Sequence, residues 1–220
     1  GRVFRNEGID LDHNPEFTLL ESYQSYADYN DVMSMVEALV VQVAKETLGT
    51  DRIPFNGHEV DLSLPWSRRP LREAILEYGN IDIDDYPEAS RLAERMRALD
   101  IAITYTASRG YLVDKLLATY VEPWLIQPTF LIDYPVEMSP LAKARVDNPR
   151  YAERFEVFIG GMEIANSFTE LNDPAVQRFR WNEQEALRRQ YQGEELDRID
   201  EDFLIALEHG MPPTGGLGIG

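Results

Sequence analysis

A pair of glycines, Gly160-Gly161, stands between two strand-like runs and constrains the fold more than any other feature of this chain. Residues 154–159 and 162–171 are rich in β-branched and aromatic side chains, which favour strands. A two-residue glycine turn between such runs predicts a tight hairpin, and hairpins pair their strands antiparallel. Asn56-Gly57 gives the same signal earlier in the chain. The sheet is therefore expected to be mainly antiparallel.

The remaining elements follow from hydrophobic spacing and from capping residues. Asn30 is expected to cap a helix that Gly49 ends. Strands gather toward the two ends of the chain and do not alternate with helices, which predicts an α+β fold and not a doubly wound parallel sheet. Further strands are expected at residues 2–7, 16–27, 52–55, 58–62 and 128–133 and in the Gly-rich end of the chain. Further helices are expected near residues 70–78, 86–98, 110–122, 174–191 and 201–208.

Composition limits the kinds of partner that suit this chain. The 220 residues carry 39 acidic and 21 basic side chains, a formal net charge of -18, which opposes non-specific binding to nucleic acid or anionic membrane. The absence of cysteine excludes disulfides and thiolate zinc sites, and the three histidines are scattered. No apolar run approaches the roughly 20 residues of a membrane span. With no signal peptide recognised, we expect a cytoplasmic protein without a membrane partner.

The first two predicted strands carry side chains that suit a charged ligand. Arg5 and Glu7 share one face of the first strand, and Phe17, Glu21 and Tyr23 share one face of the second. If the strands pair, one surface displays a guanidinium, two carboxylates, a ring and a phenol. An arginine fork suits phosphate or carboxylate, and the aromatic ring suits stacking on a heterocycle. The alternative is a solvated sheet face with routine ion pairs.

The Gly160-Gly161 hairpin brings two further carboxylates together. With a two-residue turn, Glu156 and Glu163 become diagonal neighbours on one face, roughly 7–8 Å apart. They repel each other unless a positive charge lies between them. Mg²⁺ is the natural candidate, because it takes oxygen ligands and bridges carboxylates to substrate phosphates. The alternative is two solvated glutamates, paired with Arg154 or another arginine.

The second strand of this hairpin carries another candidate set. Asn166, Phe168 and Glu170 share a face, but regular alternation places that face opposite Glu163. A β-bulge between residues 163 and 166 would bring both sets to one site.

An ammonium group would suit three of these side chains, Glu21, Tyr23 and Glu170, if they converge in one pocket. Two carboxylates would neutralise its charge and the phenol would add a directional acceptor. The residues alone therefore point to a phosphate ligand that needs Mg²⁺ and to a cationic ligand, without specifying a reaction.

Several segments, in order along the whole chain, match the motifs of one known family. FRNEG (residues 4–8) and HNPEFT (residues 13–18) are similar to motif 2 of the class II aminoacyl-tRNA synthetases. Four further segments resemble the lysyl-tRNA synthetase family in particular: LLESYQSYADY (19–29), LIQPTF (125–130), YPVEMSPLA (134–142) and NSFTELND (166–173). LEHGMPPT (207–214) followed by GLGIG (216–220) resembles the start of motif 3.

The resemblance implies a class II catalytic core and a two-step reaction without a covalent enzyme intermediate. Lysine attacks the α-phosphate of ATP to form lysyl-adenylate, and the lysyl group then passes to tRNA(Lys). Mg²⁺ and a homodimeric parent protein are also implied. Catalysis would rest on positioning and on neutralising phosphate charge.

The resemblance also assigns residue roles. Arg5 corresponds to the catalytic arginine that binds the α-phosphate and the lysine carboxylate. The remaining ATP residues are Glu7 at the adenine amino group, Phe17 stacked on adenine and His13 toward the terminal phosphates. Glu156 and Glu163 match the metal-binding carboxylates. The lysine pocket is matched by Glu21, Tyr23, Asn166, Phe168 and Glu170, with Glu170 and Tyr23 nearest the ε-ammonium.

The chain departs from the family pattern at four positions. Asp12 stands where the family usually has a basic residue, and Met162, Ala165 and Ser167 stand where it commonly has arginine, glycine and glycine. Motif 1, which builds the dimer interface, the anticodon-binding barrel and the motif 3 arginine are missing. Residues 1–220 are therefore expected to be a partial catalytic domain, incomplete at both ends.

Two alternatives remain open on the sequence. One is the paralogue that lysylates a translation elongation factor and lacks the anticodon domain, although the Asn6-Glu7-Gly8 form of motif 2 favours the synthetase. The other is a non-catalytic binding module descended from a synthetase, for which Asp12 and the missing motif 3 arginine are the support.

Overall fold

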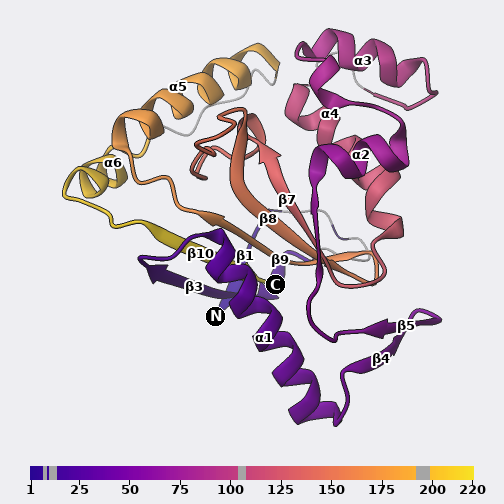
Figure 1. The fold of residues 1–220 in the computed structure, drawn as a ribbon. Helices are drawn as coiled ribbons and strands as arrows, with labels where there is room; N and C mark the ends of the chain where they lie inside the picture. The colour runs from indigo at the N-terminus through magenta and orange to yellow at the C-terminus, as the bar shows by residue number, and fades with distance from the viewer. Residues whose placement is uncertain (7–8, 10–13, 104–107, 192–198) are drawn as a thin grey trace.

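A six-stranded sheet forms the centre of the molecule, with helices packed on both of its faces (Figure 1). The computed structural model describes residues 1–6, 9, 14–103, 108–191 and 199–220. The strand order is β3-β10-β9-β8-β7-β6. Its strands are β3 (Leu20–Ser25), β6 (Ser67–Pro70), β7 (Thr129–Pro135), β8 (Tyr151–Ile159), β9 (Met162–Thr169) and β10 (Thr214–Ile219). Every neighbouring pair is antiparallel except β6 with β7. The predicted α+β class with a mainly antiparallel sheet is confirmed.

Two small hairpins and six α-helices complete the described fold. The hairpins are β1 (Arg2–Phe4) with β2 (Glu16–Thr18) and β4 (Arg52–Phe55) with β5 (His58–Asp61). The helices are α1 (Tyr29–Leu48), α2 (Leu71–Gly79), α3 (Ala89–Arg97), α4 (Arg109–Leu116), α5 (Pro174–Tyr191) and α6 (Glu201–Glu208). The Asn56-Gly57 turn joins β4 to β5 as predicted, with both residues at positive φ.

The N-cap of helix α1 lies two residues before the predicted one. Asp28 caps the helix by accepting hydrogen bonds from the amides of Asn30 and Asp31, and the Asp31 carboxylate accepts from the Asp28 amide in return. The prediction of Asn30 as the cap was therefore wrong, because a reciprocal capping box satisfies two backbone donors at once. Gly49 ends the helix at a φ of 73°, as predicted.

Each face of the central sheet has its own hydrophobic core. Helix α1 packs Val32, Met33 and Val36 against Phe155 and Leu217 on one face. On the other face, a second set of apolar side chains from α2, α3 and α4 covers the β7 and β8 part of the sheet. The β9, β10 and β3 part of that second face carries none of this cluster, and it is where the candidate site lies.

A β-bulge interrupts the β8–β9 hairpin near its turn. Val157 lies opposite Ala165, whereas Phe158 lies opposite Glu163, so Ile164 is the extra residue. The predicted bulge between residues 163 and 166 is confirmed. It turns Glu163 to the same face as Asn166, which strict alternation would not allow.

Three other elements differ from their predictions. The run 16–27 forms two strands instead of one, because β2 pairs with β1 while β3 pairs with β10. The helix predicted at residues 110–122 is α only to Leu116 and then continues as a π-helical turn over Leu117–Val121, just before Pro123. Strand β6 was not predicted, since its Ser-Arg-Arg-Pro sequence has no apolar alternation and its pairing with β7 is non-local.

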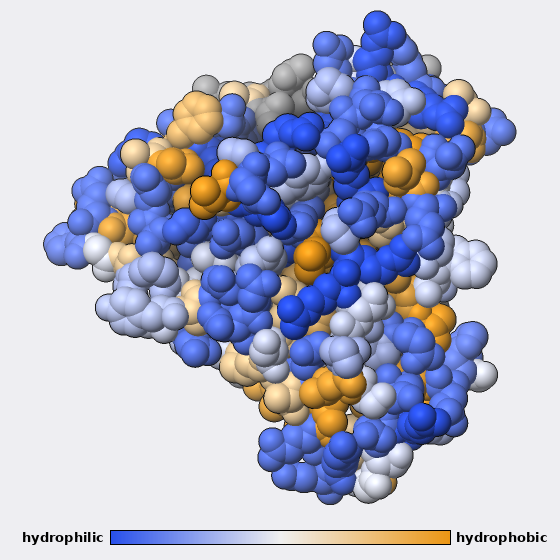
Figure 2. All heavy atoms as spheres, in the orientation of Figure 1, coloured by the Kyte–Doolittle hydropathy of each residue, from blue (hydrophilic) through white to orange (hydrophobic). Residues whose placement is uncertain are grey.

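The surface in the orientation of Figure 2 is mostly hydrophilic, with hydrophobic residues in separate small groups. Among the described helices, none combines the length and the apolar character needed to cross a bilayer.

Candidate functional site

The candidate site is a cavity of about 760 Å³ over the uncovered part of the sheet. It brings together segments from both ends of the chain, namely β2, β3, β9 and β10. Most of the residues predicted for a ligand line it: Arg5, Phe17, Glu21, Tyr23, Glu163, Asn166, Phe168 and Glu170. Glu7, His13 and Asp12 lie outside the described residues.

Strand β10 forms the floor of the cavity, because it presents glycines where neighbouring strands present side chains. Gly216 pairs with Tyr23 on one side and Phe168 on the other, and Gly218 pairs with Glu21 and Asn166. An added Cβ at Gly216 would overlap the Glu170 carboxylate oxygen and approach the Tyr23 ring to 3.2 Å. Glycine is therefore required there for two polar side chains to meet above the strand.

The sheet register aligns the site residues in two rows that run across the strands. The first row is Tyr23, Gly216, Phe168 and Arg154. The second row is Glu21, Gly218, Asn166 and Glu156. Each row therefore has side chains from β3, β9 and β8, with a glycine of β10 between those of β3 and β9.

The carboxylate of Glu170 is the most perturbed acid of the site. Desolvation by burial raises its pKa from 4.5 to about 7. Tyr23 has a raised pKa as well, because it is partly desolvated and lies near the carboxylates of Glu170 and Glu21. Ionising this carboxylate is unfavourable until a cation arrives. The pocket is therefore built to receive positive charge.

At the other end of the cavity, an arginine and an aromatic ring lie together. The Arg5 guanidinium carbon is 5.2 Å from the centre of the Phe17 ring. The Arg5 amide also donates to the Pro15 carbonyl at 2.9 Å, which fixes the backbone beside the end of β1. A planar cation beside a ring can bind an anionic oxygen next to a stacked heterocycle.

The two predicted metal ligands have different surroundings. Glu156 is buried: one carboxylate oxygen accepts from the Tyr134 hydroxyl at 2.6 Å and the other from Arg154 at 2.5 Å. The pairing with Arg154 was one of the sequence-based alternatives, but Glu156 is not the solvated glutamate which that alternative described. Glu163 is exposed on the same face. Within the described part of the chain, no group of three or more His, Cys, Asp or Glu is placed to hold a metal ion.

This donor set still fits Mg²⁺. A carboxylate has about four lone-pair positions, so the two hydrogen bonds to Glu156 leave acceptor capacity. Mg²⁺ commonly takes only one or two protein carboxylates, with water and phosphate oxygens completing its octahedron. Glu156 and Glu163 would supply those two carboxylates.

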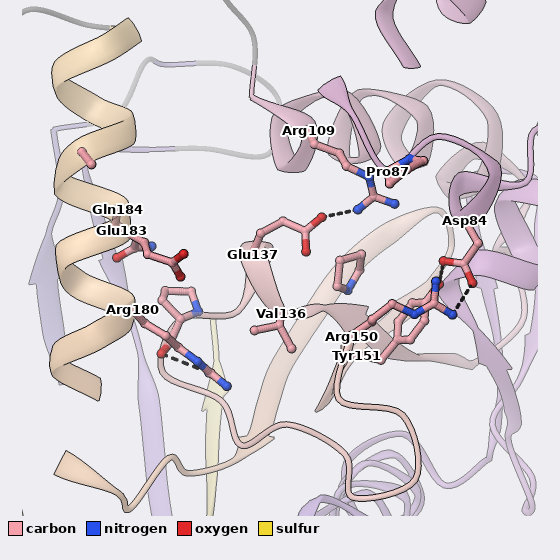
Figure 3. Close-up of a pocket in the computed structure, with 13 residues that line it drawn as sticks. Asp84, Pro87, Arg109, Val136, Glu137, Arg150, Tyr151, Arg180, Glu183 and Gln184 are labelled. Atoms are coloured by element: carbon pink, nitrogen blue, oxygen red, sulfur yellow. Dashed lines mark hydrogen bonds and ion pairs between the residues drawn. The ribbon is translucent and has the colours of Figure 1, made fainter. Parts of the chain in front are cut away.

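A second cavity, of about 690 Å³, lies between α5, the start of β8 and the turn after β7 (Figure 3). Its arginines are already engaged. Arg109 pairs with Glu137, Arg150 pairs with Asp84 at 3.0 Å, and Arg180 donates to the backbone carbonyls of residues 139, 140 and 142. These contacts hold the surrounding turns together, and none of the predicted ligand residues lines this cavity.

Sequence reasoning missed three contributors to the site. Tyr134 was not singled out, and Gly216 and Gly218 were read only as part of a terminal strand and of the start of motif 3. The Gly-x-Gly alternation of β10 was the available signal, since it removes side chains from a single face of a strand.

Comparison with known proteins agrees with this geometry. A family described as tRNA synthetases class II (D, K and N) matches residues 1–220. A lysine--tRNA ligase from Dehalococcoides mccartyi is 52% identical over 220 residues, covering 100% of this chain and 44% of that protein. The corresponding proteins of Moorella thermoacetica and Chloroflexus aurantiacus are 50% and 49% identical, over all of this chain and 45% of their own length. The chain spans less than half the length of these relatives. The family resemblance of the motifs is thus confirmed, and the chain belongs to the class II tRNA synthetases of the D, K and N group.

Proposed function

We propose that the natural protein carrying this chain is a ligase that activates lysine with ATP and transfers it to tRNA(Lys). The relatives that match the whole chain are named lysine--tRNA ligases, which supports this assignment. Residues 1–220 would be the part of the catalytic domain that handles the small substrates.

The observation that carries the proposal is the acidic end of the cavity. Glu170, Tyr23 and Glu21 meet above a floor that Gly216 and Gly218 leave free of side chains. The ε-ammonium of lysine would neutralise the desolvated Glu170 carboxylate and donate to the Tyr23 oxygen. Asn166 and Phe168 would contact the rest of the amino acid from β9.

The arginine end of the cavity would bind the nucleotide. Adenine would stack on Phe17, with Glu7 at its amino group, and His13 would lie toward the terminal phosphates. Arg5 would bind both the α-phosphate and the lysine carboxylate, which places the attacking oxygen beside the phosphorus. The carboxylate oxygen then forms a bond to the α-phosphorus as the bond to pyrophosphate breaks. The protein contributes orientation and positive charge, and no side chain becomes covalently modified.

Glu156 and Glu163 would hold Mg²⁺ against the phosphates. When bound, the ion neutralises the charge that develops on the pyrophosphate leaving group.

The same assignment implies a homodimeric, cytoplasmic protein with tRNA(Lys) as its macromolecular substrate. The elongation-factor-lysylating paralogue and the non-catalytic module find no support among the relatives described above.

Lysine-dependent exchange of labelled pyrophosphate into ATP is the decisive experiment. Lysine should support exchange far better than arginine or ornithine, because Glu170 and Tyr23 suit one ammonium position. Equal exchange rates with the three amino acids would contradict the lysine assignment. Exchange should also fall when Glu170 is replaced by glutamine.

A further inference from the structure

One side chain of the first row, that of Arg154, hydrogen-bonds to two side chains of the second row. Arg154 in β8 stands opposite Phe168 in the first row, two residues before Glu156 in the second row. Its side chain is only 14% exposed, and the Glu156 side chain 10%. Arg154 does not line the cavity itself. It can therefore act on a ligand only through the groups that it holds.

The guanidinium uses all three of its nitrogens. Nε donates to Asn166 Oδ1 at 3.2 Å, and one terminal nitrogen donates to Glu156 Oε1 at 2.5 Å. The other terminal nitrogen donates to the Met138 carbonyl at 2.7 Å and to the Ser139 hydroxyl at 3.1 Å. The guanidinium carbon also lies 4.6 Å from the centre of the Tyr134 ring. A fork with fixed geometry and this many partners has one orientation.

The bond to Asn166 determines which end of that side-chain amide faces the ligand. Arginine has only donors, so it can bind only the amide oxygen of asparagine. With Oδ1 turned toward Arg154, the NH₂ group is left for the cavity that Asn166 lines. The site thus presents a donor at this position, which suits a carboxylate or phosphate oxygen of a substrate.

The bonds to Glu156 act on the residue that pairs with Asn166 in the same row. Arg154 and Tyr134 each hold one carboxylate oxygen, so the plane of the carboxylate is fixed before any ion arrives. Groups that orient a metal ligand in this way typically change metal affinity or activity by about 10- to 100-fold when they are removed.

We propose that Arg154 is a positioning residue of this site: it orients the Glu156 carboxylate for the metal ion and turns the NH₂ group of Asn166 toward the amino-acid substrate. The proposal rests on the proposed function. It extends that function by a residue that touches neither substrate.

Two substitutions separate the two roles. Arg154→Met removes the charge and every donor while keeping a long buried side chain. Arg154→Lys keeps a cation for Glu156 but cannot also reach Asn166 and the Met138 carbonyl with a planar fork. Arg72→Met is the matched control, because Arg72 is also a half-buried arginine that pairs with carboxylates (Asp82 and Asp84), but outside the cavity.

Three quantities should be measured on the natural protein. They are the Mg²⁺ concentration for half-maximal pyrophosphate exchange, the lysine Kd by calorimetry without ATP or Mg²⁺, and the free energy of unfolding in urea. Arg154→Met should raise the Mg²⁺ requirement about 10- to 100-fold and the lysine Kd about tenfold. Arg154→Lys should raise mainly the lysine Kd. The control variant should lower the free energy of unfolding without changing the Mg²⁺ requirement or the lysine Kd.

Glu156→Gln tests whether Arg154 acts through Glu156. Adding Arg154→Met to this variant should not raise the Mg²⁺ requirement further, since the two residues would act as one unit. If Arg154→Met raises the Mg²⁺ requirement of the Glu156→Gln variant as much as that of the wild type, the metal part of the proposal is overturned. Unchanged Mg²⁺ requirement and lysine Kd in a folded Arg154→Met protein would overturn all of it, and Arg154→Lys serves if the methionine variant does not fold. If the wild type activates another amino acid, the proposed function fails, and the same measurements with that amino acid still decide the role of Arg154.

Discussion

Replacing Glu170 by glutamine should stabilise the ligand-free protein above pH 7 and strongly weaken its affinity for lysine. Desolvation raises the pKa of Glu170 from 4.5 to about 7. Each pKa unit of such a difference corresponds to about 1.4 kcal/mol, so ionising this carboxylate in the folded state costs up to about 3.5 kcal/mol. Because solvent still reaches part of the side chain, screening reduces the expected cost to about 1–2 kcal/mol.

The sign of the pH dependence follows from proton binding. Between pH 4.5 and about 7 the folded protein holds a proton on Glu170 that the unfolded chain has lost. The contribution of Glu170 to the free energy of unfolding of the wild type should therefore decrease as pH rises through this window. Above pH 7 this decrease should be complete. Glutamine does not ionise, so the variant should lack this component. The difference between the two proteins should be negligible below pH 4.5.

Lysine binding should show the opposite response. Only ionised Glu170 pairs with the ε-ammonium, so the lysine affinity of the wild type should rise about tenfold from pH 6 to pH 8, with proton release on binding below pH 7. Removing one partner of such a charged pair costs about 2–5 kcal/mol, so Glu170→Gln should weaken lysine binding by more than about thirtyfold.

Urea unfolding and lysine titration calorimetry at pH 5, 6, 7 and 8 measure both effects. Glu46→Gln, on the exposed side of α1 where Glu46 contacts Gln42, is the matched control and should behave as the wild type. An unchanged pH slope in Glu170→Gln would refute the desolvation argument. Lysine binding at wild-type affinity by that variant would refute the recognition of the ammonium by Glu170.

Three further outcomes are expected. Gly216→Ala should weaken lysine binding at least tenfold, because its Cβ would displace the Glu170 carboxylate, whereas Gly218→Ala, with no atom nearer than 3.8 Å to its Cβ, should cost much less in the same titration. Phe17→Ala should weaken ATP binding by about 1–3 kcal/mol through lost stacking and leave the lysine Kd measured without ATP unchanged; an equal loss of both would contradict a nucleotide role. Gly160→Ala should lower the free energy of unfolding in urea by about 1–3 kcal/mol. The φ angle of Gly160 is +66°, and the added Cβ would lie 2.5 Å from an aromatic ring of the β4–β5 hairpin. Unchanged stability would contradict the strain at this turn.

Local signals predicted most of the secondary structure. The turn glycines, the αL cap at Gly49 and the 3.6-residue spacing of α1 depend on neighbours within a few residues, so the chain carries them without a partner. The missed elements depend on distant segments. Strand β6 exists because β7 pairs with it, and the run 16–27 divides because β1 and β10 take different halves.

In the candidate site, too, the features that depend on nearby residues were predicted, and those that depend on distant segments were missed. The sequence predicted that Glu163 and Asn166 could share a face only through a bulge, and the bulge at Ile164 is present. The partners of Glu156 were less accessible to sequence reasoning: Arg154 was named as one alternative, and Tyr134 was not named. Tyr134 belongs to β7, and only the β7–β8 register together with the irregularity at residue 133 directs its hydroxyl to Glu156.

The sequence by itself determined the family, the hairpins, the charge of the site and most of the residues that line it. Motifs, turns and the alternation of side chains depend only on residues that are close together in the sequence. Tertiary structure decided how these groups combine. Strand register alone makes neighbours of residues near positions 22, 155, 168 and 217. It places the Gly216 backbone beneath the Glu170 side chain, and it brings Arg154 within hydrogen-bond distance of Asn166. The raised pKa of Glu170 arises in the same way, since desolvation depends on atoms packed around a side chain and not on its neighbours in sequence.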